Sequence, residues 1–224
     1  MRGTVMRKTP SEGIFITVEG PDGSGKSTQV DLLVTFLRDQ QHRVLVTREP
    51  GGTGVGEAIR KILLEPARGN HLADEAELFL FAAARAQHVR EVILPALSQG
   101  QIVIASRYLD ATVAYQGYGR NLPLDTIRIV NNLATGGLTP DMTIILDVEA
   151  ETGLHRAKGT DKDTPSGEMD RIEAAGIDFH RRVRQGYFAI AAAEPGRCIV
   201  MDGGKPIAEV AAQIQHCLKD RFAI

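Results

Sequence analysis

Short apolar runs alternate along the chain with longer segments in which apolar residues recur every three or four positions. The runs lie at residues 14–18, 43–47, 101–106, 142–146 and 198–201. They are nearly continuous in apolar residues, which is typical of strands covered on both faces of a parallel sheet. The periodic segments between them predict helices on those two faces. The pattern therefore predicts an α/β fold in three layers, with a parallel sheet of about five strands.

The periodic segments predict the positions of the helices. Val30, Leu33, Val34 and Leu37 recur at helical spacing within residues 29–37. Further helices are predicted around residues 58–63, from 74 to about 97, near 123–134, from 171 to 193, and from 206 to about 219.

Two segments lack the apolar residues that a packed element needs. Residues 1–13 have no apolar centre of the kind found in a secretory signal, and we expect a flexible tail. Residues 158–168 contain no Val, Ile, Leu or aromatic residue, so they are predicted to form a mobile surface loop, interpreted as a lid at about 156–171. A chain of 224 residues is long enough for one α/β domain, which we place at residues 14–224.

The composition argues against several classes of protein. The 26 Lys and Arg nearly balance the 28 Asp and Glu, so there is no overall positive field to hold a nucleic-acid polymer. No apolar run approaches the ~20 residues that cross a bilayer. Cys198 and Cys217 form neither a zinc motif nor a disulfide framework, which fits a reducing cytoplasm. We therefore expect a cytoplasmic protein whose partners are small molecules, without nucleic acid or membrane.

A glycine-rich turn joins the first predicted strand to the first predicted helix. Its sequence, GPDGSGKS at residues 20–27, satisfies the pattern G-x-x-x-x-G-K-[ST] in the strand–loop–helix context that the pattern requires. Backbone N–H groups and the helix N-terminus attract phosphate in such a loop, while Lys26 would reach the β and γ phosphates and Ser27 would ligate Mg²⁺. An ordinary glycine turn with a capping serine is the alternative. The predicted ATP-binding residues are Gly20, Pro21, Asp22, Gly23, Ser24, Gly25, Lys26, Ser27 and Thr28.

A nucleotide triphosphate site does not by itself say what the nucleotide is used for. GTPases and other ATPases share the P-loop NTPase fold. The chain has no segment like the N-K-x-D sequence that reads guanine, and it is short for a motor or transporter ATPase. A small kinase is therefore the favoured class.

Five segments of the chain resemble thymidylate kinases, in the order of that family. They are VEGPDGSGKSTQ (18–29), TREPGGT (47–53), LFAAARAQHV (80–89), SRYLDATVAYQGYGR (106–120) and DRIE (170–173). The resemblance covers roughly residues 14–222. It implies an enzyme that transfers the γ-phosphoryl group of ATP to dTMP with Mg²⁺, giving dTDP and ADP for dTTP synthesis. It also implies a homodimer whose interface includes the helix at 74–97.

The resemblance assigns roles to an aromatic residue and three arginines on the acceptor side. Phe81 and Arg85 stand four residues apart and so project from one helix face. The resemblance implies that the Phe stacks on thymine and the Arg donates to its exocyclic oxygen; a core Phe with a surface Arg is the alternative. Arg48 and Arg107 follow strands, at the sheet edge where ligands bind. The resemblance implies that both bind the acceptor phosphate; surface salt bridges are the alternative.

The remaining acceptor contacts are implied by the resemblance. Tyr115 would lie under the deoxyribose and leave no room for a 2′-hydroxyl, although an ordinary packing tyrosine is the alternative. Asp22 would lie near the 3′-hydroxyl. Weaker candidates complete the predicted substrate-binding set: Glu49, Pro50, Ala111, Thr112 and Gln116.

Members of this family carry an additional cation either in the P-loop or in the lid. Asp22 is followed by Gly23 and not by arginine, so the resemblance implies a lid cation, for which the chain offers Arg156, Lys158, Lys162 and Arg171. The predicted catalytic residues are Lys26, Arg48, Arg107, Arg156, Lys158 and Glu173. Glu173 matches a family acid near the metal. Ser106 stands where the family usually has an aspartate that helps to organise Mg²⁺.

Two rival functions stay open at this level. One is a kinase for another nucleoside monophosphate. The other is a nucleotide-binding regulatory protein without turnover, motivated by Ser106 and by a predicted lid with few arginines.

Overall fold

A five-stranded parallel sheet organises the protein. The structure is a computed structural model that describes residues 13–65, 72–157, 170–222 and 224. Its strands are β1 (Ile14–Glu19), β2 (Val44–Arg48), β3 (Ile102–Ser106), β4 (Met142–Asp147) and β5 (Cys198–Asp202). They pair in the order β2-β3-β1-β4-β5, all in parallel. The predicted parallel sheet is confirmed.

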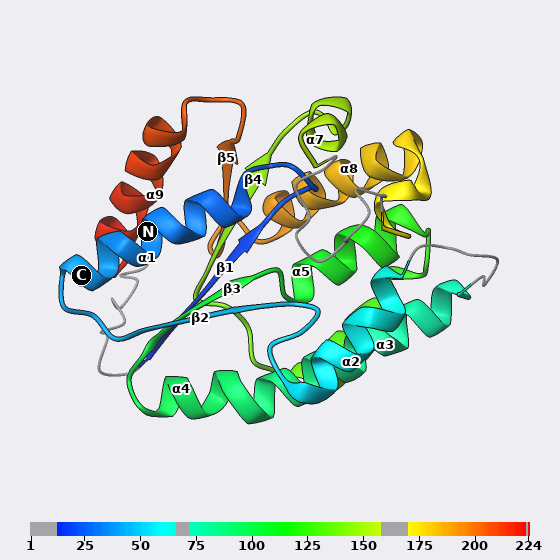
Figure 1. Ribbon diagram of the computed structural model, residues 1–224, viewed down its shortest axis with the longest axis horizontal. Helices are drawn as coiled ribbons and strands as arrows, with labels where there is room; N and C mark the ends of the chain where they lie inside the picture. The colour runs from blue at the N-terminus through cyan, green and yellow to red at the C-terminus, as the bar shows by residue number, and fades with distance from the viewer. Residues whose placement is uncertain (1–12, 66–71, 158–169, 223) are drawn as a thin grey trace.

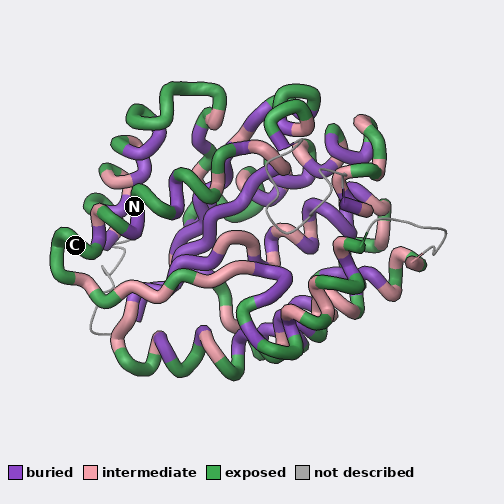
Figure 2. The backbone as a smooth tube through the Cα atoms, in the orientation of Figure 1, coloured by how far each residue is buried: buried purple, intermediate pink, exposed green. Residues whose placement is uncertain are grey.

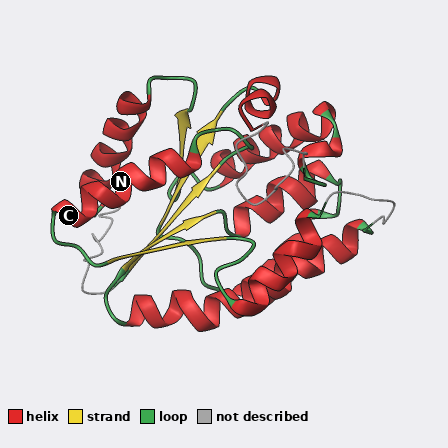
Figure 3. Cartoon of the chain, viewed as in Figure 1, coloured by secondary structure: helices red, strands yellow, loops and turns green. Residues whose placement is uncertain are grey.

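Helices lie on both faces of the sheet (Figure 1, Figure 3). The α-helices are α1 (Lys26–Asp39), α2 (Gly54–Leu64), α3 (Asp74–His88), α4 (Leu94–Ser98), α5 (Leu109–Thr112), α6 (Leu124–Thr135), α7 (Ala150–Ala157), α8 (Ile177–Ala193) and α9 (Ile207–Arg221). Two π-helical segments, η2 (Val89–Ile93) and η3 (Val113–Gly119), continue α3 and α5, and η4 (Glu173–Ala175) is a 3₁₀ turn.

The central strand β1 shows how the sequence pattern builds the two layers of core. All six of its residues are buried, as the purple sheet in Figure 2 shows. Successive side chains of a strand point to opposite faces. Ile14 and Ile16 accordingly pack in the cluster that includes α1 and α9, whereas Phe15 packs with η2 and α4. Continuous burial, and not alternation, is what the apolar run predicted.

The structure corrects three features of the predicted helices. The segment predicted as one helix from 74 to about 97 contains the π-helical turn η2 between α3 and α4. The helix predicted from Arg171 is wrong at its start: it begins at Ile177, because Gly176 has a φ of 87°, outside helical geometry. The helices α5 and α7 were not predicted.

Parts of two predicted segments lie outside the described residues. These are residues 1–12 of the tail and residues 158–169 of the predicted lid. Among the helices that are described, none combines the length and the apolar character needed to span a membrane.

Candidate active site

The phosphate loop lies at the carboxyl end of β1, beside the point where the sheet order reverses. Gly20, Gly23 and Gly25 have positive φ values of 136°, 69° and 91°. L side chains rarely adopt these conformations, so glycine lets the chain curl around an anion. A Cβ at Gly23 would also lie 2.0 Å from the Gly153 carbonyl oxygen of α7. The loop therefore needs glycine here both for its backbone conformation and for its close contact with α7.

Lys26 begins α1 and folds back over the loop. Its Nζ donates to the carbonyl oxygens of Gly20 at 3.1 Å and Pro21 at 2.7 Å. Burial, and then the Arg107 charge, lower the pKa of Lys26 from 10.5 to about 7. Anionic phosphates beside the ammonium group would raise that pKa again. The lysine thus has its cation positioned above the loop where a phosphate would sit.

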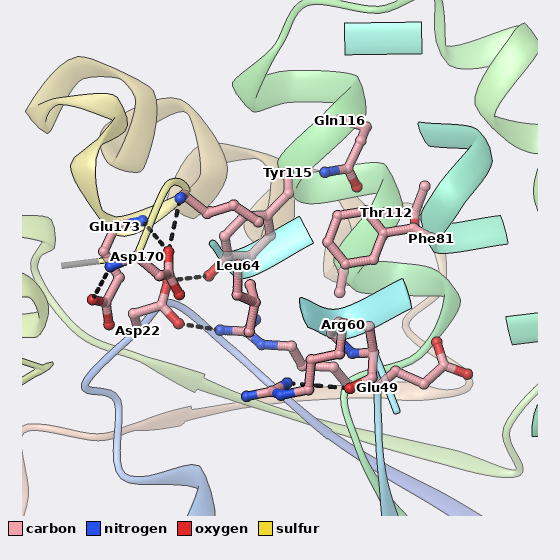
Figure 4. Close-up of a pocket in the computed structure, with 14 residues that line it drawn as sticks. Asp22, Glu49, Arg60, Leu64, Phe81, Thr112, Tyr115, Gln116, Asp170 and Glu173 are labelled. Atoms are coloured by element: carbon pink, nitrogen blue, oxygen red, sulfur yellow. Dashed lines mark hydrogen bonds and ion pairs between the residues drawn. The ribbon is translucent and has the colours of Figure 1, made fainter. Parts of the chain in front are cut away.

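A pocket of about 600 Å³ opens beside this loop (Figure 4). Its lining combines residues from the ends of strands with residues from α2, α3 and η3. Every residue of the predicted substrate-binding set lines it except Arg48 and Arg85. The lining residues are Asp22, Glu49, Pro50, Arg60, Leu64, Phe81, Arg107, Ala111, Thr112, Tyr115, Gln116, Asp170, Ile172 and Glu173.

Asp22, Arg107 and Tyr115 meet where the phosphate loop joins the pocket. The Arg107 guanidinium ion-pairs with Asp22 Oδ1, lies 4.8 Å from the centre of the Tyr115 ring, and donates to the Gly20 carbonyl at 3.0 Å. The Tyr115 hydroxyl donates to Asp22 Oδ2 at 2.8 Å. Burial alone would raise the pKa of Asp22, but the Arg107 and Lys26 charges and the tyrosine hydroxyl lower it from 3.8 to about 2. Asp22 is therefore a fixed anion that holds Arg107 and Tyr115 in place.

Arg85 lies behind the pocket wall, in a buried polar network. Its side chain is 1% exposed, so the alternative of a surface arginine is wrong. Its Nε donates to Glu49 Oε2 at 2.8 Å and its NH1 to Thr112 Oγ1 at 2.8 Å. The same guanidinium donates to Asn131 Oδ1 and to the Tyr108 carbonyl. Arg85 thus fixes two pocket-lining residues, Glu49 and Thr112.

The other two predicted catalytic cations that the structure describes lie outside the pocket lining. Arg48 ends β2, is 43% exposed, and pairs with Glu57 at 3.3 Å. Arg156 is exposed on α7 and donates to the Gly203 carbonyl at 3.1 Å. A Cβ on Gly203 would lie 2.9 Å from the Ser24 carbonyl, so this contact places Arg156 beside the phosphate loop. Lys158 lies outside the described residues.

Glu173 and Asp170 line the pocket from the segment that precedes α8. Asp170 Oδ1 accepts from the backbone N–H of Glu173 at 2.8 Å, and Glu173 Oε2 accepts from that of Asp170 at 3.2 Å. These reciprocal bonds hold both carboxylates near Asp22 (Figure 4). Within the described ranges, no three His, Cys, Asp or Glu side chains come together as a metal cage.

Comparison with known proteins identifies the family. The family model for thymidylate kinase matches residues 18–214. The chain belongs to the thymidylate kinase family. The thymidylate kinase of Halothermothrix orenii is 46% identical over 92% of this chain and 97% of its own. That of Deinococcus radiodurans is 46% identical over 94% and 98%. A crystal structure of thymidylate kinase from Ehrlichia chaffeensis matches with a TM-score of 0.74 and 34% identity over 92% of this chain and 98% of that one.

The family assignment confirms the predicted fold class, enzyme class and function as a thymidylate kinase. The sequence predictions missed Arg60, Leu64, Asp170 and Ile172, which also line the pocket of this thymidylate kinase. Arg60 and Leu64 stand four residues apart on α2, so helical spacing places them on one face. The sequence held that signal, but nothing in it indicated that this face of α2 meets the pocket.

Proposed function

We propose that this thymidylate kinase transfers the γ-phosphoryl group of ATP to dTMP, giving dTDP and ADP, and so supplies dTTP synthesis. The observation that carries the proposal is the position of Arg107. Its guanidinium donates to the Gly20 carbonyl of the phosphate loop and also lines the adjoining pocket. A cation at that junction suits a phosphate acceptor that must lie in line with the γ-phosphate of the donor.

The pocket lining supports a deoxyribonucleotide acceptor. Phe81 presents a ring for stacking on thymine, and Tyr115, held by Asp22, would lie under the sugar where a 2′-hydroxyl needs space. Arg85 has donated both NH1 hydrogens and its Nε hydrogen to protein acceptors. A direct bond from Arg85 to the base would therefore use the remaining NH2 hydrogen. Gln116 and Thr112 are the further base contacts in the proposal.

The chemistry requires positioning more than proton abstraction. A phosphate monoester has its second pKa near ~6, so the acceptor is already an anion near neutral pH. Lys26 holds the donor phosphates, while Arg107 and Arg48 hold the acceptor phosphate, which places the attacking oxygen in line.

Mg²⁺ is part of the proposal, and the residues present fit it. Mg²⁺ in kinases is held by one or two protein oxygens together with substrate phosphates, so a cage of protein side chains is not needed. Ser27, exposed at the start of α1, would be its protein ligand, and Glu173, which lines the adjoining pocket, is the proposed acid near the metal. The ion would supply neutralisation of the charge on the transferred group.

Arg156 and Lys158 are proposed as the cations that reach the transferred phosphoryl group. In the P-loop itself, a side chain at position 23 would collide with the Gly153 carbonyl. A cation reaching from the lid side therefore suits this chain better than one within the loop.

A cytoplasmic homodimer, with residues 14–224 as one domain, completes the proposal. Helix α3 packs against α2 and also against α6. Large apolar side chains of α3 and α6 remain exposed to solvent. Phe79, Ile129 and Leu133 are 59%, 67% and 80% exposed. Apolar exposure of this kind marks a protein interface, and a second copy of the chain is the proposed partner. Leu133→Glu should convert the dimer to a monomer in sedimentation velocity.

A coupled ADP-release assay tests the activity. We expect the highest kcat/KM with dTMP, a lower value with dUMP, and much lower values with UMP and purine monophosphates. Equal values for all acceptors would overturn the assignment of dTMP. Tight binding of ATP and dTMP without ADP release would show that the chain is a regulatory protein.

A further inference from the structure

Glu19 is a buried carboxylate that lies next to the site but does not line the pocket. It ends β1, immediately before the phosphate loop, and is 0% exposed. One carboxylate oxygen accepts from the backbone N–H of Tyr108 at 2.7 Å, and the other accepts from the Tyr187 hydroxyl at 2.9 Å. Burying a carboxylate costs free energy because the group loses its hydration. The two hydrogen bonds of Glu19 offset part of that cost, and what they position is the question.

The first bond fixes the backbone turn that carries Arg107. Arg107 has a φ of 69°, in the left-handed region that a non-glycine residue seldom adopts. The N–H of Arg107 is bonded to the Val18 carbonyl at 3.0 Å, and the next N–H, that of Tyr108, is bonded to Glu19. Strand β1 therefore holds both amides that flank the strained residue.

The second bond leads to the guanidinium of Arg107. The Tyr187 hydroxyl donates its only hydrogen to Glu19, so its oxygen lone pairs remain available as acceptors. Arg107 NH1 donates to that oxygen at 3.3 Å. Glu19 is thus connected to Arg107 through its backbone and through its side chain.

We propose that Glu19 is a positioning residue for Arg107, which it aims at the acceptor phosphate through the Tyr108 amide and the Tyr187 hydroxyl. The proposal rests on the proposed role of Arg107 as an acceptor-phosphate ligand. Glu19 itself touches no substrate in this scheme, since it lies beneath the site and is fully buried.

Both partners of Glu19 are donors, one on each carboxylate oxygen, so the position needs two acceptor oxygens. Burial, and then the Asp110 charge, raise the pKa of Glu19 from 4.5 to about 7, against the opposing effects of Arg107, Tyr187 and the Tyr108 amide. A glutamine here would have one acceptor oxygen for two donors. Because the Tyr108 N–H cannot turn away, the glutamine NH₂ would face Tyr187 and displace the hydroxyl hydrogen from its present bond.

Binding of dTMP and of thymidine to the intact enzyme, measured by calorimetry, tests the proposal. Thymidine lacks the phosphate, so its binding does not use the proposed contact between Arg107 and the acceptor phosphate. Tyr187→Phe keeps the ring and should weaken dTMP binding about threefold to tenfold while leaving thymidine binding unchanged. Glu19→Gln should weaken dTMP binding at least as much. Tyr118→Phe is the matched control, because Tyr118 packs against Gly186, beside Tyr187 in sequence.

A double-mutant cycle separates this proposal from the role of Arg107 itself. Arg107→Ala should weaken dTMP binding strongly, and adding Tyr187→Phe should then have no further effect. Unchanged dTMP binding in Arg107→Ala would overturn the proposed phosphate ligand. A loss in Arg107→Ala with no loss in Tyr187→Phe, or an equal loss for dTMP and thymidine, would overturn the role of Glu19 and leave that of Arg107 standing.

Discussion

The proposed acceptor pocket and the phosphate loop of this thymidylate kinase are built in different ways. The pocket wall is held by buried charged pairs, such as Arg85 with Glu49 at 2.8 Å. In the phosphate loop, the Lys26 ammonium donates to the loop's own carbonyl oxygens of Gly20 and Pro21. The pocket is therefore organised by the protein's own anions, whereas the lysine faces backbone oxygens that phosphates would replace.

The difference follows from what each half must recognise. A pocket that selects one base needs polar groups already fixed, because an unfulfilled buried partner is what rejects the wrong substrate. A triphosphate is recognised by backbone N–H groups and by charge, which every nucleotide triphosphate shares. In the proposed function, the preassembled pocket would therefore select the acceptor, whereas the loop would bind the donor phosphates.

The largest loss of turnover is expected from removing Lys26 of the phosphate loop. Lys26→Ala removes the fixed cation from the donor phosphates, and turnover should fall about 10³–10⁵-fold, the range seen for losing a cation on a transferred phosphoryl group. Binding of dTMP should change far less than turnover, because Lys26 makes its hydrogen bonds within the phosphate loop and acts on the pocket-lining Asp22 through its charge. ADP release and calorimetry measure the two quantities.

Lys219→Ala, on the exposed end of α9, is the matched control for Lys26→Ala and should behave as wild type. A loss of dTMP binding that matched the loss of turnover in Lys26→Ala would show that the two halves are not separate.

The next prediction concerns Arg85, which lies in the buried network behind the pocket wall. Arg85→Ala removes the guanidinium that pairs with the buried Glu49 carboxylate and leaves Glu49 with its contact to His88 Nδ1 at 3.0 Å, so the free energy of unfolding should fall by about 3–5 kcal/mol. The KM for dTMP should rise as Glu49 and Thr112 lose their partner, while ATP binding should change little. Urea unfolding followed by circular dichroism measures the stability.

Two variants check the cause of that loss. Adding Glu49→Gln to Arg85→Ala should recover part of the stability, because a neutral amide then replaces the buried carboxylate that lost its guanidinium partner. Arg128→Ala, in the exposed pair with Asp125, should change stability little. A wild-type stability in Arg85→Ala would mean that the buried network does not hold the wall.

Asp22 lies on the boundary between the two halves, and its charge can be tested by pH. Its pKa is lowered to about 2 in the folded state, so its contribution to stability is present above pH 3.8 and is lost as the pH falls toward 2. The difference in the free energy of unfolding between wild type and Asp22→Asn should shrink by on the order of 2 kcal/mol between pH 5 and pH 2. Urea unfolding across that range measures it. A constant difference would show that Asp22 is not held as an anion by Arg107 and Lys26.

The sequence was informative wherever a local pattern determines the structure. Apolar runs gave the strands, and the P-loop pattern gave the turn between β1 and α1. Arg107 was placed at the sheet edge because it follows β3, and the structure puts it there.

The sequence alone did not reveal hydrogen-bond partners that come from distant segments of the chain. Helical spacing put Phe81 and Arg85 on one face, yet Phe81 lines the pocket and Arg85 is buried behind it. Glu49, 36 positions from Arg85 along the chain, decides that burial, and no local period reveals such a pair. Glu19 was hidden for the same reason, since its partner Tyr187 lies 168 positions away.

The mildest loss is predicted for Ser106, which stands where the family usually has an aspartate. This residue ends β3, and its carbonyl accepts from the Glu49 N–H at 3.0 Å, so its backbone supports the pocket. If transfer depends on positioning and charge, a missing carboxylate at this place weakens Mg²⁺ organisation without ending catalysis. Ser106→Ala should cost less than about tenfold in kcat/KM, or 1.4 kcal/mol, because it leaves that backbone bond intact.

Ser106→Asp should then affect the Mg²⁺ requirement at the ATP phosphates and not the binding of dTMP. It should lower the Mg²⁺ concentration that gives half the maximal rate, with the KM for dTMP unchanged, in a titration of ADP release against Mg²⁺. If the wild type proved inactive and Ser106→Asp restored turnover, the chain would be a regulatory member of its family. If Ser106→Ala were as damaging as Arg107→Ala, the serine hydroxyl would belong to the acceptor half, and the division of the site at this strand end would be wrong.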